Sequence, residues 1–134
     1  MRHVEDNALE LANDGGIVRV IESDPQVRAM LTASLVAMGV SVIPLDSLDH
    51  DTSPVSATLV DVSLLRRSRD WAGAYLRLGG PLVFLLSTVQ DEFWLTSQLG
   101  LVPSNVLRKP FRLADLARSI REVADRCEPK SRAG

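Results

Sequence analysis

Three polar side chains stand at the ends of apolar, strand-like segments, and their chemical types suit a phosphoryl group. Asp61 and Ser87 each close such a segment, and Lys109 follows a third one directly. If the segments form parallel strands, the three side chains meet at the carboxyl edge of an open α/β sheet, where ligands bind. A carboxylate could carry the phosphoryl group there, while a hydroxyl and an ammonium hold its oxygens. The sequence therefore indicates a phosphoryl site at that edge.

The elements that must position these residues alternate between strands and helices. Asp24-Pro25 is a good helix start, with an acid at the N-cap and proline at the first helical position, and Gly39 is a stop signal. Repeated βα units predict a parallel sheet with right-handed crossovers and helices on both faces. The expected strands cover Ile17–Ile21, Val40–Ile43, Ala57–Asp61, Pro81–Leu86 and Val106–Arg108; the expected helices include residues 25–38, 71–78, 93–95 and 113–123. The polar segment 45–56 has room for a short helix only.

Length and composition describe one globular domain. A chain of 134 residues with 46% hydrophobic residues can bury a core without staples, and its net charge of −2 gives no electrostatic case for nucleic-acid binding. The single cysteine, Cys127, excludes an internal disulfide. No segment approaches the ~18 apolar residues of a membrane span. Because the N-terminus also lacks the apolar region of a signal peptide, we expect a cytoplasmic protein.

The expected organisation has three parts. Residues 1–16 contain four acids and end in a glycine pair, so we expect a flexible leader there. The folded domain is expected over residues 17–126, followed by a tail over 127–134. Only nine residues follow Asp125, so no output domain is expected.

The chain resembles the receiver domains of response regulators. Ile21–Arg28 is similar to their first strand and helix start, and Asp61 falls where they carry their phosphorylated aspartate. Ser87 matches their strand-four hydroxyl, and Lys109-Pro110-Phe111 matches their strand-five signature. This resemblance covers residues 17–126. It implies a flavodoxin/CheY-like fold, a doubly wound five-stranded parallel sheet in the order 2-1-3-4-5.

The resemblance also implies roles for these residues. Asp61 would take a phosphoryl group from a histidine kinase or phosphotransfer protein, and the protein would then act on a downstream protein target. Ser87 would hydrogen-bond a phosphoryl oxygen. Lys109 would pair with Asp61 and later with the phosphate. The peptide bond between Lys109 and Pro110 would be cis. Without the resemblance, Asp61 could be a turn or cap residue, and the hydroxyl at Ser87-Thr88 could cap the next helix.

The metal site of this family is altered here. Receivers place two adjacent acids after strand one, and this chain has Glu22 and Ser23 there. The implied Mg²⁺ ligands are Glu22, Asp61 and the backbone carbonyl of Ser63. Since Ser23 replaces an acid, we expect a weak or absent site and slow or metal-insensitive phosphorylation. Asp24 is better explained as a helix N-cap than as a substitute ligand.

Two further positions depart from the family pattern. Residues 64–70 hold three arginines where the family has a Met-Pro pair and a glycine; we expect a solvated loop and helix start, or a partial substitute for the cation. The switch aromatic of strand five is replaced by Val106. Phe93 or Trp94 could carry such a switch, although their helical spacing indicates core residues.

Three functions are compatible with these residues. The first is a single-domain receiver in a phosphorelay, accepting phosphate on Asp61. The second is a pseudo-receiver that acts without phosphorylation as an interaction or dimerisation module. A flavodoxin-like cofactor-binding protein is disfavoured, because the acidic segment Glu22–Pro25 would repel a cofactor phosphate. We expect no enzymatic activity of the first two.

Overall fold

The computed structural model describes residues 16–48, 54–78, 81–100 and 105–127, with side chains up to residue 122. The expected leader, apart from residue 16, and the expected tail, apart from residue 127, therefore lie outside the described residues. None of the described helices is long and apolar enough to cross a membrane.

A single parallel sheet forms the centre of the fold, in the order β2-β1-β3-β4-β5. This is the order that the family resemblance implied, and it is confirmed. The strands are β1 (Ile17–Ile21), β2 (Ser41–Leu45), β3 (Ala57–Asp61), β4 (Leu82–Leu86) and β5 (Val106–Arg108). Because all of them are parallel, their carboxyl ends share one edge of the sheet.

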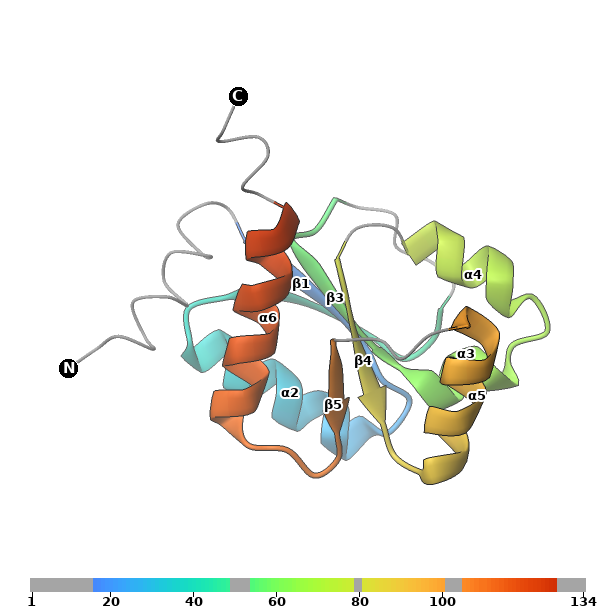
Figure 1. Ribbon diagram of the computed structural model, residues 1–134. Helices are drawn as coiled ribbons and strands as arrows, with labels where there is room; N and C mark the ends of the chain where they lie inside the picture. The colour runs from blue at the N-terminus through green and yellow to red at the C-terminus, as the bar shows by residue number, and fades with distance from the viewer. Residues whose placement is uncertain (1–15, 49–53, 79–80, 101–104, 128–134) are drawn as a thin grey trace.

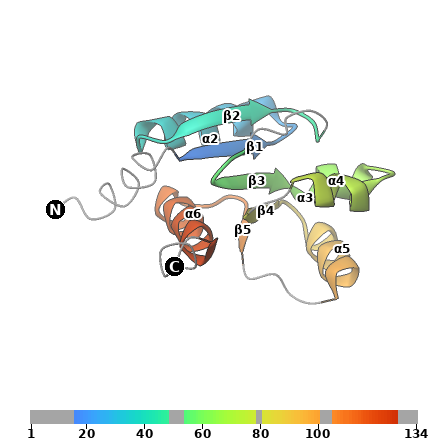
Figure 2. The ribbon, with the colours of Figure 1, turned by 90° about the horizontal axis from the view of Figure 1, so that it is seen from above.

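Helices cover both faces of the sheet (Figure 1). One face carries α2 (Pro25–Ala37) and α6 (Leu113–Cys127), and the other carries α3 (Val62–Arg67), α4 (Trp71–Leu78) and α5 (Val89–Leu99). Seen from above, α6 lies on one side of the strands and α3, α4 and α5 lie on the other (Figure 2). The helices return the chain to the amino edge of the sheet, where the next parallel strand begins.

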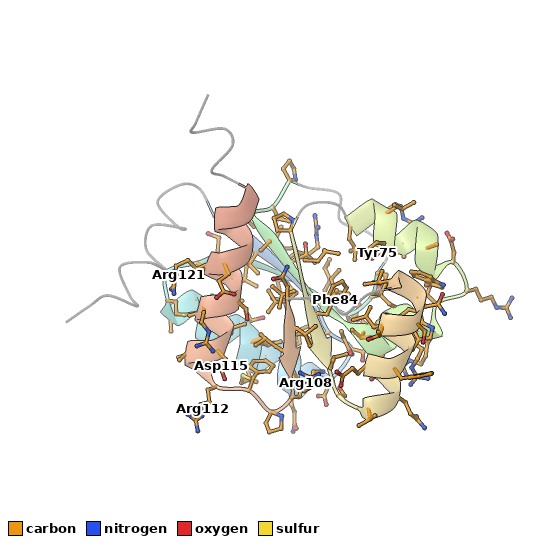
Figure 3. All side chains as sticks on the ribbon, in the orientation of Figure 1. Tyr75, Phe84, Arg108, Arg112, Asp115 and Arg121 are labelled. Carbon is orange, nitrogen blue, oxygen red and sulfur yellow. The ribbon has the colours of Figure 1, made fainter. Side chains whose placement is uncertain are left out.

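Side chains that alternate along the strands build two separate cores. On β3, Leu59 faces α2 and α6, whereas Val60 faces the three-helix side. Both residues are fully buried, and all five residues of β3 are buried, so this strand does not alternate between a buried and an exposed face. On the three-helix side Tyr75 of α4 stacks on Phe84 of β4, with ring centroids 6.4 Å apart (Figure 3).

The second strand is longer than the sequence indicated. We expected it to end before Pro44, but β2 continues through Pro44 to Leu45, and Pro44 pairs with Val20 in the register of β1. Proline is tolerated there because β2 is the edge strand, so the missing N–H removes no ladder bond to an outer neighbour.

Two other expectations are corrected. The short helix expected within 45–56 is absent from the described part of that segment, residues 45–48 and 54–56; residues 49–53 lie outside it. Phe93 is not a core residue, because its side chain is 74% exposed. Asp91 and Leu95 occupy the buried face of α5 and turn Phe93 outward, while Trp94 is half-buried against the core.

Candidate functional site

The site lies at the carboxyl edge of the sheet, where β1 and the adjacent β3 end and where β5 ends beyond β4. Glu22 follows β1, Asp61 ends β3, and Lys109 follows β5. The Lys109 ammonium lies 2.7 Å from Oε1 of Glu22 and 3.9 Å from Oδ1 of Asp61. Strands that are distant in sequence thus bring two carboxylates and one ammonium together, as the sequence predicted for Asp61 and Lys109. The Lys109–Pro110 peptide bond is cis, as the resemblance implied.

Asp61 is also the N-cap of α3, so both interpretations of this residue hold. Its Oδ1 accepts hydrogen bonds from the backbone N–H of Ser63 at 3.1 Å and from the Ser63 hydroxyl at 3.0 Å. The hydroxyl lies 3.0 Å from Oδ2 as well, and its single proton can serve only one oxygen at a time. The carboxylate is almost fully buried. The Ser63 hydroxyl therefore competes with an incoming phosphoryl group for one oxygen of Asp61.

Glu22 is the most deeply buried acid of this site, with 1% of its surface exposed. Its Oε1 accepts from Lys109, and its Oε2 accepts from the backbone N–H of Asp24 at 3.1 Å. Burial raises the pKa of Glu22 above its ordinary value, while the hydrogen bonds from Lys109 and Asp24 act in the opposite direction. In the described structure, Glu22 rather than Asp61 is the closer partner of Lys109.

This burial predicts a pH dependence of stability that Glu22→Gln should remove. The folded-state pKa of Glu22 is raised above the unfolded value of about 4.3, so the folded protein binds the proton more tightly. The stability of the wild type minus that of Glu22→Gln should be constant below the unfolded pKa and should fall as pH rises through the folded pKa. Urea unfolding of both proteins between pH 4 and pH 7.5 measures this difference. A difference that grows with pH contradicts the assignment.

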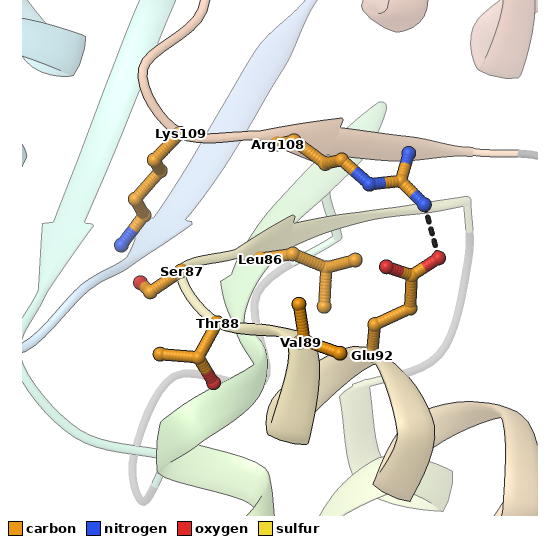
Figure 4. Close-up of a pocket in the computed structure, with 7 residues that line it drawn as sticks. All are labelled: Leu86, Ser87, Thr88, Val89, Glu92, Arg108 and Lys109. Atoms are coloured by element: carbon orange, nitrogen blue, oxygen red, sulfur yellow. Dashed lines mark hydrogen bonds and ion pairs between the residues drawn. The ribbon is translucent and has the colours of Figure 1, made fainter.

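Ser87 and Thr88 divide the roles that the sequence left open between them. Ser87 is exposed and lines a pocket of about 120 Å³ with Lys109, Arg108 and Glu92, and Figure 4 shows the Lys109 side chain extending toward Ser87. Thr88 is the N-cap of α5, where its hydroxyl accepts the backbone N–H of Asp91 at 3.0 Å. Ser87 therefore leaves its hydroxyl exposed at the pocket, and the hydroxyl that caps the helix is that of Thr88.

The groups expected to hold Mg²⁺ do not form a ready-made cation site. Ser23 is exposed and neutral, and Oε1 of Glu22 is occupied by Lys109. The carbonyl of Ser63 lies in the first turn of α3 and accepts the Nε–H of Arg67 at 3.1 Å, so it points along the helix rather than toward Asp61. Within the described residues, no group of three or more acidic, histidine or cysteine side chains could hold a metal ion.

The segment after Asp61 differs from the loop that the sequence indicated. Residues 62–67 form α3 directly after β3, and only residues 68–70 separate α3 from α4. Val62 and Leu65 point into the core, which is why this short segment is helical rather than solvated. Sequence reasoning missed the ion pair between Arg66 of α3 and the buried Asp91 of α5, at 2.7 Å. Neither residue lies in a recognisable motif. The spacing of Val62 and Leu65 could have indicated the helix, but nothing in the sequence indicated the ion pair.

Comparisons with known proteins support the fold. No protein-family model matches the sequence, and no curated protein matches it. Among solved structures, a response regulator receiver protein from Burkholderia phymatum is 20% identical with a TM-score of 0.65, covering 82% of this chain and 95% of that one. A receiver domain protein from Clostridium thermocellum is 17% identical with a TM-score of 0.68, covering 89% and 99%. A receiver protein from Sinorhizobium medicae WSM419 is 15% identical with a TM-score of 0.65, covering 82% and 94%.

These similarities extend over nearly the whole length of the receiver domains. At such low identity they show the fold and not the chemistry of individual residues. The chain has the flavodoxin/CheY-like fold of response-regulator receiver domains, with the same sheet order that the described residues display.

Proposed function

We propose that this chain is a receiver in two-component phosphorelay signalling, which takes a phosphoryl group on Asp61 and passes the signal on through protein contacts. The observation that carries the proposal is the meeting of Asp61, Glu22 and Lys109 at one edge of a receiver-type sheet. Such an edge is where open α/β sheets bind ligands. The phosphoryl donor would be a histidine kinase or a phosphotransfer protein, and the target of the signal would be a downstream protein.

The proposed transfer uses groups that this chain supplies. One carboxylate oxygen of Asp61 attacks the phosphorus of a phosphohistidine, and the new O–P bond forms as the P–N bond breaks. The ring nitrogen keeps the electron pair of the broken bond, and because the other ring nitrogen already carries a proton, the histidine leaves as neutral imidazole. Lys109 needs to shift only from Glu22 toward Asp61 to neutralise a phosphoryl oxygen, since its ammonium already lies 3.9 Å from Asp61. Ser87, beside Lys109 in the pocket, would donate to a second oxygen. Positioning and charge neutralisation of this kind carry most of phosphoryl transfer.

A pseudo-receiver is the second candidate, and two observations favour it. Both oxygens of Asp61 lie at 3.0 Å from the Ser63 hydroxyl, and Lys109 is closer to Glu22 than to Asp61. The acids at this edge are thus satisfied by the protein itself. In this alternative the fold serves as an interaction or dimerisation module, and Asp61 acts only as the cap of α3.

Mass spectrometry of the intact protein separates the two functions. After incubation with acetyl phosphate or phosphoramidate, we expect an adduct with the mass of one phosphoryl group on the wild type and none on Asp61→Asn. Because the expected metal donors have other partners, the extent of labelling should change little between Mg²⁺ and a chelator. Ser63→Ala should label faster, since it frees an oxygen of Asp61. A wild type without any adduct, with or without Mg²⁺, would leave the pseudo-receiver as the function.

A further inference from the structure

A second buried carboxylate lies outside the site at the edge of the sheet. Asp91, in the first turn of α5, is 1% exposed, and Oδ1 of its carboxylate accepts the Nε–H of Arg66 at 2.7 Å. Its backbone N–H donates to the Thr88 hydroxyl. A buried carboxylate is costly unless a charge partner and hydrogen bonds compensate it, so this contact fixes α3 against α5.

Two separate connections lead from the site to Asp91. Asp61 caps the start of α3, and Arg66 lies near the end of the same six-residue helix. On the other side, Ser87 lines the pocket beside Lys109, and the next residue, Thr88, caps α5 at Asp91. Asp91 is therefore the point at which both connections meet. A change at Asp61 that alters the cap of α3 has a direct route to Arg66.

The geometry makes the α3–α5 contact sensitive to such a change. A helix of six residues is too short to be stable alone, so packing and the ion pair hold α3 in place. If Arg66 moves away, Asp91 is left as a buried charge without the guanidinium described here, and the first turn of α5 has to open to water. Coupling between the two sites requires a second arrangement of this contact, in which Arg66 has left Asp91.

The residue that would carry such a change in the resembled family is missing. Val106 on β5 is an aliphatic side chain packed beside the core, and it cannot move between a buried and an exposed aromatic rotamer. By contrast, α5 presents Val89 and Phe93, one turn apart and 80% and 74% exposed. A small rotation of α5 changes how these two side chains are presented to a partner.

We propose that Arg66 and Asp91 are positioning residues that couple the state of Asp61 to the orientation of α5. The proposal deepens the receiver role and rests on it for its biological meaning. The coupling itself can be measured without any phosphoryl group, because Asp61→Asn removes the negative charge at the start of α3 and replaces the second acceptor oxygen near the Ser63 hydroxyl by an amide NH₂.

The two tryptophans of the chain provide the readout. Trp71 of α4 and Trp94 of α5 meet edge to face with ring centroids 5.2 Å apart, so their indole signals report how α5 lies against α4. In ¹H–¹⁵N spectra we expect Asp61→Asn to shift the Trp94 indole and the amides of α5. The same substitution should lose more than half of that shift when Arg66→Gln or Asp91→Asn is present.

Matched variants separate coupling from general loosening. Arg67→Gln changes the neighbouring arginine, which donates a hydrogen bond to a carbonyl of its own helix. Glu92→Gln changes a residue in the same turn of α5 as Asp91 and breaks its ion pair with Arg108 of β5. Both should leave the Trp94 response to Asp61→Asn intact. Arg66→Lys should keep part of it, and this variant also covers the case in which Arg66→Gln does not fold.

The outcomes are decisive in both directions. The proposal is overturned if Asp61→Asn shifts Trp94 equally with and without Arg66. It is also overturned if the single variant Asp61→Asn leaves the Trp94 signal where it is in the wild type. If the shift depends on Arg66 but the wild type takes no phosphoryl group, the coupling stands and the receiver role fails. If the wild type is phosphorylated and Trp94 responds independently of Arg66, the receiver role stands and the coupling fails.

Discussion

Replacing Lys109 by methionine should destabilise the folded protein by about 3 kcal/mol at neutral pH. Methionine keeps much of the lysine stem but leaves Glu22, which is 1% exposed, without its ammonium partner. Removing one member of a buried ion pair is costly because the remaining charge stays out of water. Since Glu22 can escape this by taking up a proton, the loss should shrink as the pH falls from 7 to 5. Urea unfolding followed by circular dichroism at both pH values measures it.

Two companion variants test whether the unpaired charge is the cause. Glu22→Gln combined with Lys109→Met should recover most of the lost stability, because neither charge is then buried alone. Arg108→Met alters the adjacent cation, which is exposed and pairs with the half-buried Glu92, and should change stability by less than about 1 kcal/mol. An equal loss in Lys109→Met and Arg108→Met would show that Lys109 is not a buried partner of Glu22.

The architecture follows from the sequence because local signals and burial agree. The helix start at Asp24-Pro25 was predictable, since an acid at the N-cap and proline at the first position leave few alternatives, and Asp24 indeed accepts from Gln26 and Val27. The strands β3 and β4 were predictable because parallel strands buried on both faces are largely apolar, and β4 is apolar throughout. The strand order itself came from the resemblance, because periodicity says nothing about neighbours in a sheet.

The details of the site were less accessible, because they depend on distances between strands. Sequence placed Lys109 opposite Asp61, but the structure gives the shorter contact to Glu22. Both acids lie at the same edge, and the distances from the Lys109 ammonium to them differ by less than the length of a side chain. The helix α3 was missed for a related reason: its polar arginines suggested a loop, while two apolar side chains that enter the core decide its conformation.

Restoring an acid at position 23 should raise the affinity for Mg²⁺ by roughly tenfold, or about 1.4 kcal/mol. Ser23→Asp adds a carboxylate beside Glu22 at the edge where Asp61 ends, and Mg²⁺ needs only one or two carboxylates while it keeps its waters. The new side chain can do what the Ser63 carbonyl cannot, because that carbonyl points along α3. Isothermal titration with Mg²⁺ measures the change, and Ser97→Asp, an exposed serine on α5, supplies the same added charge elsewhere.

The comparison of these two variants tests how this edge handles positive charge. If Ser23→Asp binds Mg²⁺ more tightly and Ser97→Asp does not, the wild-type edge lacks a ligand that one carboxylate restores, and Lys109 supplies the counter-charge in its absence. Labelling by acetyl phosphate should then become dependent on Mg²⁺ in Ser23→Asp alone, because an added cation and Lys109 compete for Glu22. If neither variant gains affinity, position 23 does not correspond to the acid of the resembled family, and weak Mg²⁺ binding at this edge has another origin.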